Sequence, residues 1–253
     1  MIGRPRPDDP RSTGILAGMW VFPLVAAAVA LVFAFALARQ FADRRYPYQL
    51  LWALALLMYA VASLAVALGA ANGWSRLGFE VYWLFGAVLN VPFLAAGELQ
   101  LLLRNRTVEL VLYVVLVFLT AYAIAVLRGA AYDPAELARQ LPSGKNVFGS
   151  GTPAHRLPQL ISIPSYLILV AGALWSAWTM RGRRELRDRF VGTLLIAIGA
   201  TIIAGFGSAF AALGKLPFFS VSLLAGIAIM FWGFLRASRP AGRVQAASPP
   251  SAV

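Results

Sequence analysis

Residues 50–71 read LLWALALLMYAVASLAVALGAA, a predominantly apolar run without a single charged side chain. A helix needs about 20 consecutive, mostly apolar residues to cross the hydrocarbon core of a bilayer. The run meets that length, so it predicts a transmembrane helix.

The rest of the chain repeats this pattern. Hydrophobic residues make up 60% of the sequence and charged residues only 13%, whereas soluble domains carry about 25% charged residues. The sequence therefore predicts an all-α, polytopic transmembrane bundle of seven helices. The seven predicted spans cover residues 14–38, 50–71, 79–103, 109–127, 157–180, 190–213 and 216–235.

Three regions follow from these spans: a disordered N-terminus (1–13), a membrane domain (14–236) and a disordered C-terminal tail (237–253). The first span could instead be a cleaved signal peptide, because the small-residue pattern Ala36-Leu37-Ala38 ends it. Its apolar stretch exceeds the roughly 7–15 residues of a signal sequence, which favours a retained span.

The net charge of +12 resides in the breaks between the spans. This is the charge distribution of a membrane protein whose partner is the lipid bilayer, and it excludes a nucleic-acid-binding face. Of the 22 Lys and Arg residues, 13 fall on the side of the C-terminus and nine on the side of the N-terminus. The bias predicts a cell-membrane protein with its N-terminus outside and its C-terminus in the cytoplasm.

The sequence offers no catalytic signature. It has no Cys, a single His (His155, in a loop) and no Lys or Arg inside a predicted span. We therefore predict no catalytic residue, no cofactor and no metal ligand, and expect the chain not to be an enzyme. An intramembrane enzyme acting on lipid or isoprenoid substrates remains the alternative.

Polar side chains in the third span mark a candidate ligand site. Tyr82, Gly86, Asn90, Phe93 and Gly97 recur every three to four residues and would share one helix face. An unpaired amide at mid-membrane would cost several kcal/mol, so Asn90 should point into the bundle.

Pro92 should free the carbonyl of Val88 beside Asn90, because proline cannot continue the helical hydrogen bonding. Ser162, Tyr166 and Ser176 of the fifth span would share the facing surface. Glu98 would lie at the cytoplasmic end of this pocket as a proton or cation acceptor, or else reach the head groups or pair with a loop Arg. The predicted ligand-binding residues are Asn90, Glu98, Tyr82, Val88, Ser162 and Tyr166. The alternative is that Asn90 only bonds across to a serine and locks the bundle.

The order of spans and loops is similar in spans one to three and five to seven. Either this is a parallel 3+1+3 repeat, as in some small transporters, or it is the self-similarity of any alternating loop scheme. The repeat favours transport or binding of a small molecule within the bundle. The alternative is a non-transporting sensor or an accessory subunit of a membrane complex.

Two other segments carry expectations. In the sixth span Gly199 and Gly205 would allow close helix packing, with a dimer seam as the alternative. In the long outer loop (128–156), residues 133–141 would form a short helix capped by Asp133, and residues 142–153 would cover the outer mouth.

Three stretches carry a family resemblance: LPSG (141–144), GALWSA (172–177) and FWGFL (231–235). In these stretches the chain resembles small seven-helix membrane proteins of high-GC bacteria. The resemblance implies residence in a membrane and implies no mechanism.

Overall fold

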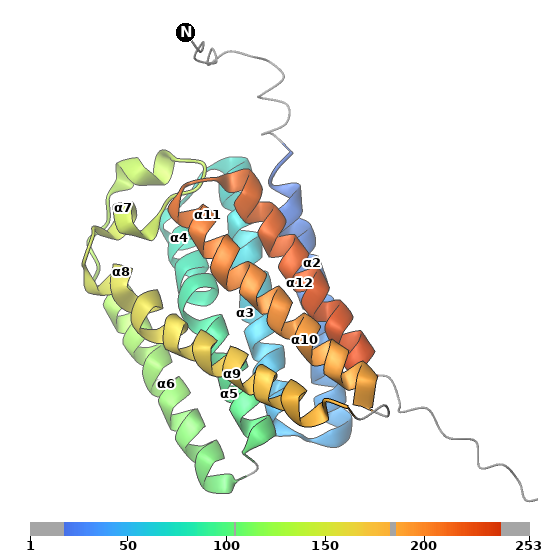
Figure 1. The fold of residues 1–253 in the computed structure, drawn as a ribbon. Helices are drawn as coiled ribbons and strands as arrows, with labels where there is room; N and C mark the ends of the chain where they lie inside the picture. Colours follow the sequence, from blue (N-terminus) through green and yellow to red (C-terminus); the bar gives the residue numbers. More distant parts are fainter. Residues whose placement is uncertain (1–17, 104, 183–185, 239–253) are drawn as a thin grey trace, which may run out of the picture.

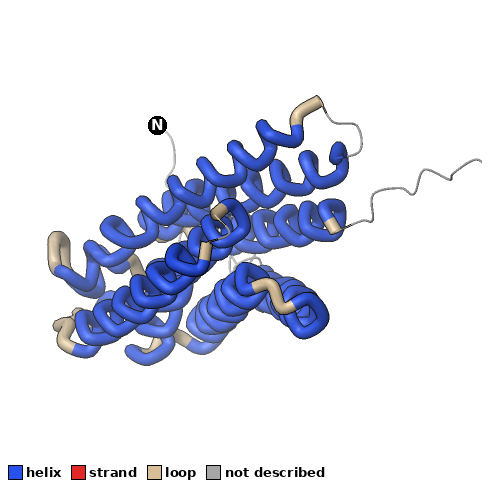
Figure 2. Tube along the Cα trace, turned by 90° about the horizontal axis from the view of Figure 1, so that it is seen from below, coloured by secondary structure: helices blue, strands red, loops and turns tan. Residues whose placement is uncertain are grey.

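The computed structural model of the chain describes residues 18–103, 105–182 and 186–238. These residues form helices and loops, with no strand among them (Figure 2). The prediction of an all-α bundle with seven candidate membrane spans is confirmed. The spans are Val21–Arg44, Pro47–Asn72, Arg76–Leu102, Arg106–Arg128, Pro153–Met180, Arg187–Ala212 and Leu216–Ala237. The predictions for residues 1–17 and 239–253 lie outside the described residues.

Four spans are single α-helices and three are segmented. The single helices are α2 (Val21–Arg44), α3 (Pro47–Asn72), α6 (Arg106–Arg128) and α12 (Leu216–Ala237). The third, fifth and sixth spans each contain a π-helical segment. The third consists of α4 (Arg76–Val81), η1 (Tyr82–Leu89) and α5 (Asn90–Leu102), the fifth of α8 (Pro153–Leu157), η3 (Pro158–Ser162) and α9 (Ile163–Met180), and the sixth of α10 (Arg187–Thr201), η5 (Ile202–Gly207) and α11 (Ser208–Ala212).

Six of the spans form a ring that follows the chain order. α2 packs on α3, α3 on the third span, the third span on the fifth, the fifth on the sixth, the sixth on α12, and α12 back on α2 (Figure 1). α6 lies outside this ring against the third span and α8. A 3+1+3 repeat would give this order, and so would any bundle whose helices follow one another around a ring. The repeat therefore stays a prediction.

We name the two ends of the bundle by the chain. The N-face is the end at which α2 begins, and the C-face is the end at which α12 finishes (Figure 1). α2 continues to Arg44, six residues past the predicted end of the first span. It stops where Arg45 adopts a left-handed conformation (φ 56°) and Pro47 follows. Backbone terminators, and not the loss of apolar residues, set this boundary.

Glycines set the distance between the sixth span and α12. A Cβ built on Gly199 would lie 2.5 Å from the carbonyl oxygen of Gly226, and one on Gly192 would lie 2.5 Å from that of Gly233. The packing prediction is therefore right for Gly199. It is wrong for Gly205, where a Cβ would meet nothing within 4 Å, because that residue faces away from the helix contact.

The long loop between α6 and α8 forms a cap on the N-face. It contains η2, a 3-10 helix (Pro134–Ala138), and α7 (Gly144–Phe148). Asp133 caps η2 by accepting a hydrogen bond from the backbone N–H of Ala135 (2.9 Å), as predicted, although η2 is shorter than the expected helix over 133–141.

Two indoles hold this cap on the bundle. Trp74 Nε1 donates to the carbonyl of Gln140 (2.9 Å), and Trp83 Nε1 donates to the carbonyl of Ala154 at the start of α8 (3.0 Å). Three apolar side chains of the cap are themselves buried: Leu141, Val147 and Phe148. The cap is thus fixed on the N-face by both apolar packing and hydrogen bonds.

Candidate functional site

A cavity of about 480 Å³ lies inside the bundle. It is enclosed by α3, the third, fifth and sixth spans and α12, so it lies between the first and second helix triplets of the chain. The cap closes part of its N-face end through Pro142, Ser143 and Gly144. Its volume falls within the range of roughly 300–1,000 Å³ that is common for small-molecule sites.

All three π-helical segments line this cavity. Tyr82, Trp83, Gly86 and Ala87 come from η1, Pro158, Gln159 and Ser162 from η3, and Ile203, Ala204 and Gly207 from η5. Short π-helical insertions within α-helices occur frequently at functional sites. Their common location indicates that the irregular backbone of three spans is concentrated around one space.

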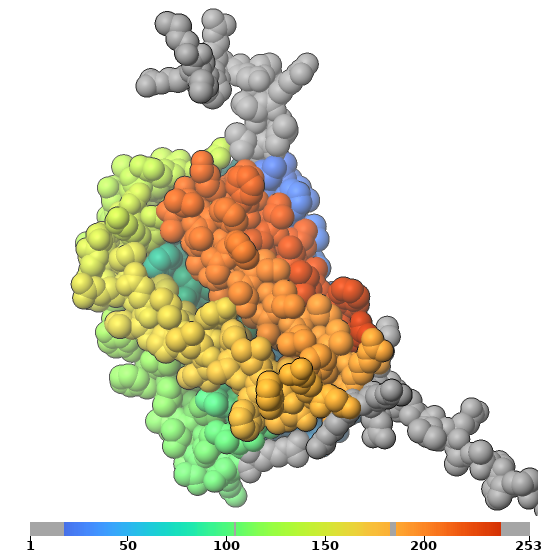
Figure 3. All heavy atoms as spheres, viewed as in Figure 1, coloured from blue at the N-terminus to red at the C-terminus, as the bar shows by residue number. Residues whose placement is uncertain are grey.

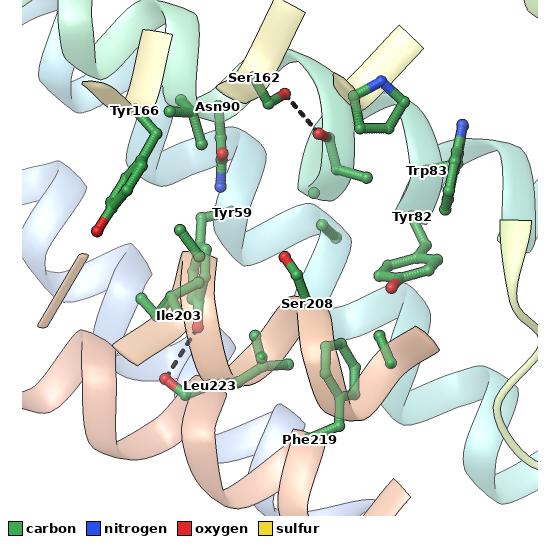
Figure 4. Close-up of a pocket in the computed structure, with 18 of the residues that line it drawn as sticks. Tyr59, Tyr82, Trp83, Asn90, Ser162, Tyr166, Ile203, Ser208, Phe219 and Leu223 are labelled. Atoms are coloured by element: carbon green, nitrogen blue, oxygen red, sulfur yellow. Dashed lines mark hydrogen bonds between the residues drawn. The ribbon is translucent and has the colours of Figure 1, made fainter. Parts of the chain in front are cut away.

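Asn90 provides the buried amide of the cavity (Figure 4). Its side chain is only 5% exposed, and its Oδ1 atom has no hydrogen-bond partner among the described residues. Across the cavity, the Tyr59 hydroxyl is already committed, because it donates to the carbonyl of Leu223 (2.9 Å). The amide oxygen of Asn90 is thus a buried acceptor without a partner, on a residue of the cavity wall.

The carbonyl of Val88 is not open to a ligand. Ser162 Oγ lies 2.6 Å from the carbonyl oxygen of Ala87 and 3.0 Å from that of Val88, and donates to both. Val88 is fully buried and does not line the cavity. The predicted link between spans three and five is therefore present, but a serine bonds the backbone of the third span and leaves the Asn90 Oδ1 unpaired.

The other predicted residues line the cavity in different ways. The Tyr166 hydroxyl donates to Thr201 Oγ1 (3.0 Å), which joins the fifth span to the sixth. Tyr82 is buried in an aromatic cluster near the N-face, with ring centroids 5.6 Å from Trp74, 5.8 Å from Phe79 and 6.1 Å from Phe219. Tyr166 thus helps to fix a wall of the cavity, and Tyr82 anchors its N-face end.

The predicted common face of the third span holds only as far as Asn90. Tyr82, Gly86 and Asn90 line the cavity, but Phe93 packs towards α6 and a Cβ on Gly97 would meet the ring of Trp52. α5 is α-helical from Asn90 onward, so side chains three and four positions further along diverge to either side of the direction in which Asn90 points. From Asn90 onward the inward face continues through Leu94 and Glu98 instead.

Glu98 lies in a second, smaller cavity of about 60 Å³. Eight residues separate it from Asn90, which is about 12 Å of helix rise towards the C-face. Four apolar side chains line both cavities and mark where the two adjoin: Leu56, Leu94, Leu169 and Met230. We call these four residues the septum. The structure therefore places Glu98 beyond the main cavity and not at its end.

The main cavity opens sideways between the fifth and sixth spans. Figure 3 shows a hollow between the yellow residues of the fifth span and the orange residues of the sixth, with teal residues of the third span at its floor. Ile163 and Ser208 are exposed on either side and line the cavity. In a bilayer this opening faces lipid, so an apolar molecule could enter without passing through water.

Sequence reasoning missed Tyr59, Ser208 and Phe219 as cavity residues. Ser208 lies on a face of small residues with Ala204, Ala211 and Ala212, and that face was the available signal. It was obscured because the glycines of the same span suggested helix packing throughout.

Comparison of the chain with known protein families, with curated proteins and with solved structures finds no match. The fold and the site therefore define the class: a multi-pass membrane protein of seven helices with an internal cavity that opens towards the lipid.

Proposed function

We propose that this protein binds a small, largely apolar molecule with one hydrogen-bonding group, taken up from the bilayer between the fifth and sixth spans. One observation carries the proposal: Asn90, whose buried Oδ1 has no partner among the described residues, lines a cavity of about 480 Å³. A buried polar atom without a partner costs about 1–3 kcal/mol. A ligand hydroxyl or amide would remove that cost.

The rest of the lining favours an uncharged ligand body. Tyr59, Phe219, Leu223 and Ile227 are buried hydrophobic residues of the cavity wall. At mid-membrane the described lining residues carry no charged side chain that could balance a ligand charge. Lys145 of the cap and His155 of α8 lie at the N-face end of the cavity.

Transport fits this architecture better than a purely structural role. The cavity lies between the two helix triplets, where parallel-repeat transporters bind their substrates, and the apolar septum lies on its C-face side. A sensor or accessory subunit requires no enclosed space of this size. We propose further that the protein resides in the cell membrane with the N-face outside, following the bias of basic residues.

The proposal can be tested with a photoreactive probe. The protein is reconstituted in lipid nanodiscs with a diazirine-bearing long-chain alcohol, irradiated, digested and mapped by mass spectrometry. Phe219 and Leu223 are the informative positions, because both are buried and both line the cavity. We expect adducts there. Adducts confined to exposed residues such as Phe118 and Leu167 would refute binding in the cavity.

Two matched comparisons sharpen the test. Ala204→Trp fills the opening between the spans and should abolish interior labelling, whereas Ala209→Trp, exposed on the same span and outside the cavity lining, should preserve it. Asn90→Leu should lower labelling by the alcohol but not by an alkane probe of equal length. Equal effects on both probes would show that Asn90 does not bond the hydroxyl.

A further inference from the structure

The second cavity encloses an isolated carboxyl group. Glu98 is 5% exposed, and its Oε1 atom is buried without a hydrogen-bond partner among the described residues. α9 covers it so closely that a Cβ on Gly172 would lie 2.6 Å from Glu98 Cγ and 3.3 Å from Oε1. One expectation from the sequence was a carboxylate that reaches the head groups or pairs with a loop Arg. The structure instead buries the carboxyl inside the ring of helices.

The described residues around Glu98 provide no compensating charge. Its cavity is lined by residues of α2, α3, α5, α9, α10 and α12, and Glu98 is the only ionisable side chain among the described lining residues. The polar members are Trp52, Ser176 and Thr193. An unpaired carboxylate at membrane depth costs several kcal/mol, whereas a neutral carboxyl can share hydrogen bonds with hydroxyls or with water.

The cavity has the size and position for proton exchange. Its volume of about 60 Å³ exceeds the roughly 10–15 Å³ that one water molecule requires. Glu98 lies four residues before the end of α5 at Leu102, which is about 6 Å of helix rise from the C-face. The septum lies where its cavity adjoins the main one. The solution at the C-face is therefore the nearer source of water for this group.

We propose that Glu98 is a proton-binding site that takes its proton from, and returns it to, the solution at the C-face. In the closed bundle the carboxyl holds the proton as an O–H group. When water enters the cavity, the proton passes to that water and leaves a carboxylate. A proton-coupled carrier needs such a proton-binding group between its substrate site and the solution on one side of the membrane. The proposal does not depend on what the main cavity binds.

Infrared spectroscopy of the protein in nanodiscs tests this directly. A protonated carboxyl has a C=O stretching band that a carboxylate lacks. At neutral pH we expect such a band in the wild-type protein, its loss in Glu98→Gln, and its shift in D2O as the proton exchanges. Either the absence of a band attributable to Glu98 or a band that does not shift in D2O would overturn the proposal.

Dicyclohexylcarbodiimide provides a second measurement that needs no variant. This reagent modifies protonated carboxyls in apolar surroundings, and peptide mass spectrometry locates the adduct. We expect modification of Glu98. Glu80 serves as the internal control, because it forms a salt bridge with Arg76 (2.7 Å) at the N-face and should stay unmodified. Equal modification of both residues would contradict a special site at Glu98.

Discussion

The contact between the sixth span and α12 gives the sharpest stability prediction. At Gly199 an added Cβ would lie 2.5 Å from the Gly226 carbonyl oxygen, 2.6 Å from Met230 Cγ and 2.9 Å from Met230 N. Ordinary contact begins at 3.4 Å, so the nearest approach is short by about 0.9 Å. Two of these three atoms belong to the backbone of α12, which cannot move away as a side-chain end can.

Gly199→Ala should therefore push the two helices apart. Overpacking of this kind costs about 1–3 kcal/mol, and the better helix propensity of Ala returns at most about 1 kcal/mol of that. We expect a lower apparent melting temperature in detergent and earlier unfolding in a denaturing-detergent titration. Gly199→Leu should be more severe, because its longer side chain must enter the same space.

Gly205→Ala is the matched control, since it makes the same change in the same span. Its Cβ meets nothing within 4 Å, so only the propensity gain remains and the variant should melt at or above the wild-type temperature. If Gly199→Ala melts with the wild type, or if both variants are equally destabilised, the close helix contact does not control stability.

Three other predictions address the links between elements. Ser162→Ala removes the donor shared by two carbonyls of the third span and should cost about 1 kcal/mol, measured by the same titration; an unchanged midpoint would contradict the link. Gly144→Ala would place a Cβ against the ring of Trp83 and should loosen the cap, seen as faster proteolysis of the loop, whereas Gly129→Ala meets only ordinary contacts and should not. A reporter fused after Arg236 should be located in the cytoplasm, and an alkaline phosphatase active outside at that position would reverse the topology.

The sequence by itself determined the seven spans of this protein. Their length and apolar composition are local properties, and a bilayer accepts a helix on those grounds alone. It also determined that Asn90 points inward, because an amide facing lipid would cost too much. The capping of η2 by Asp133 could also be predicted from the sequence, because a cap depends on adjacent residues only.

Only the tertiary structure decided which faces of the helices meet. Gly199 and Gly205 look alike in the sequence, yet one touches α12 and the other faces open space. Lipid and protein core are about equally apolar, so the pattern of a membrane helix does not mark its inner face. In the third span the inward face continues from Asn90 through Leu94 to Glu98 and not through Phe93 and Gly97. Which of these neighbouring positions turns inward depends on contacts among distant spans, which is why the cavity could not be derived from the sequence.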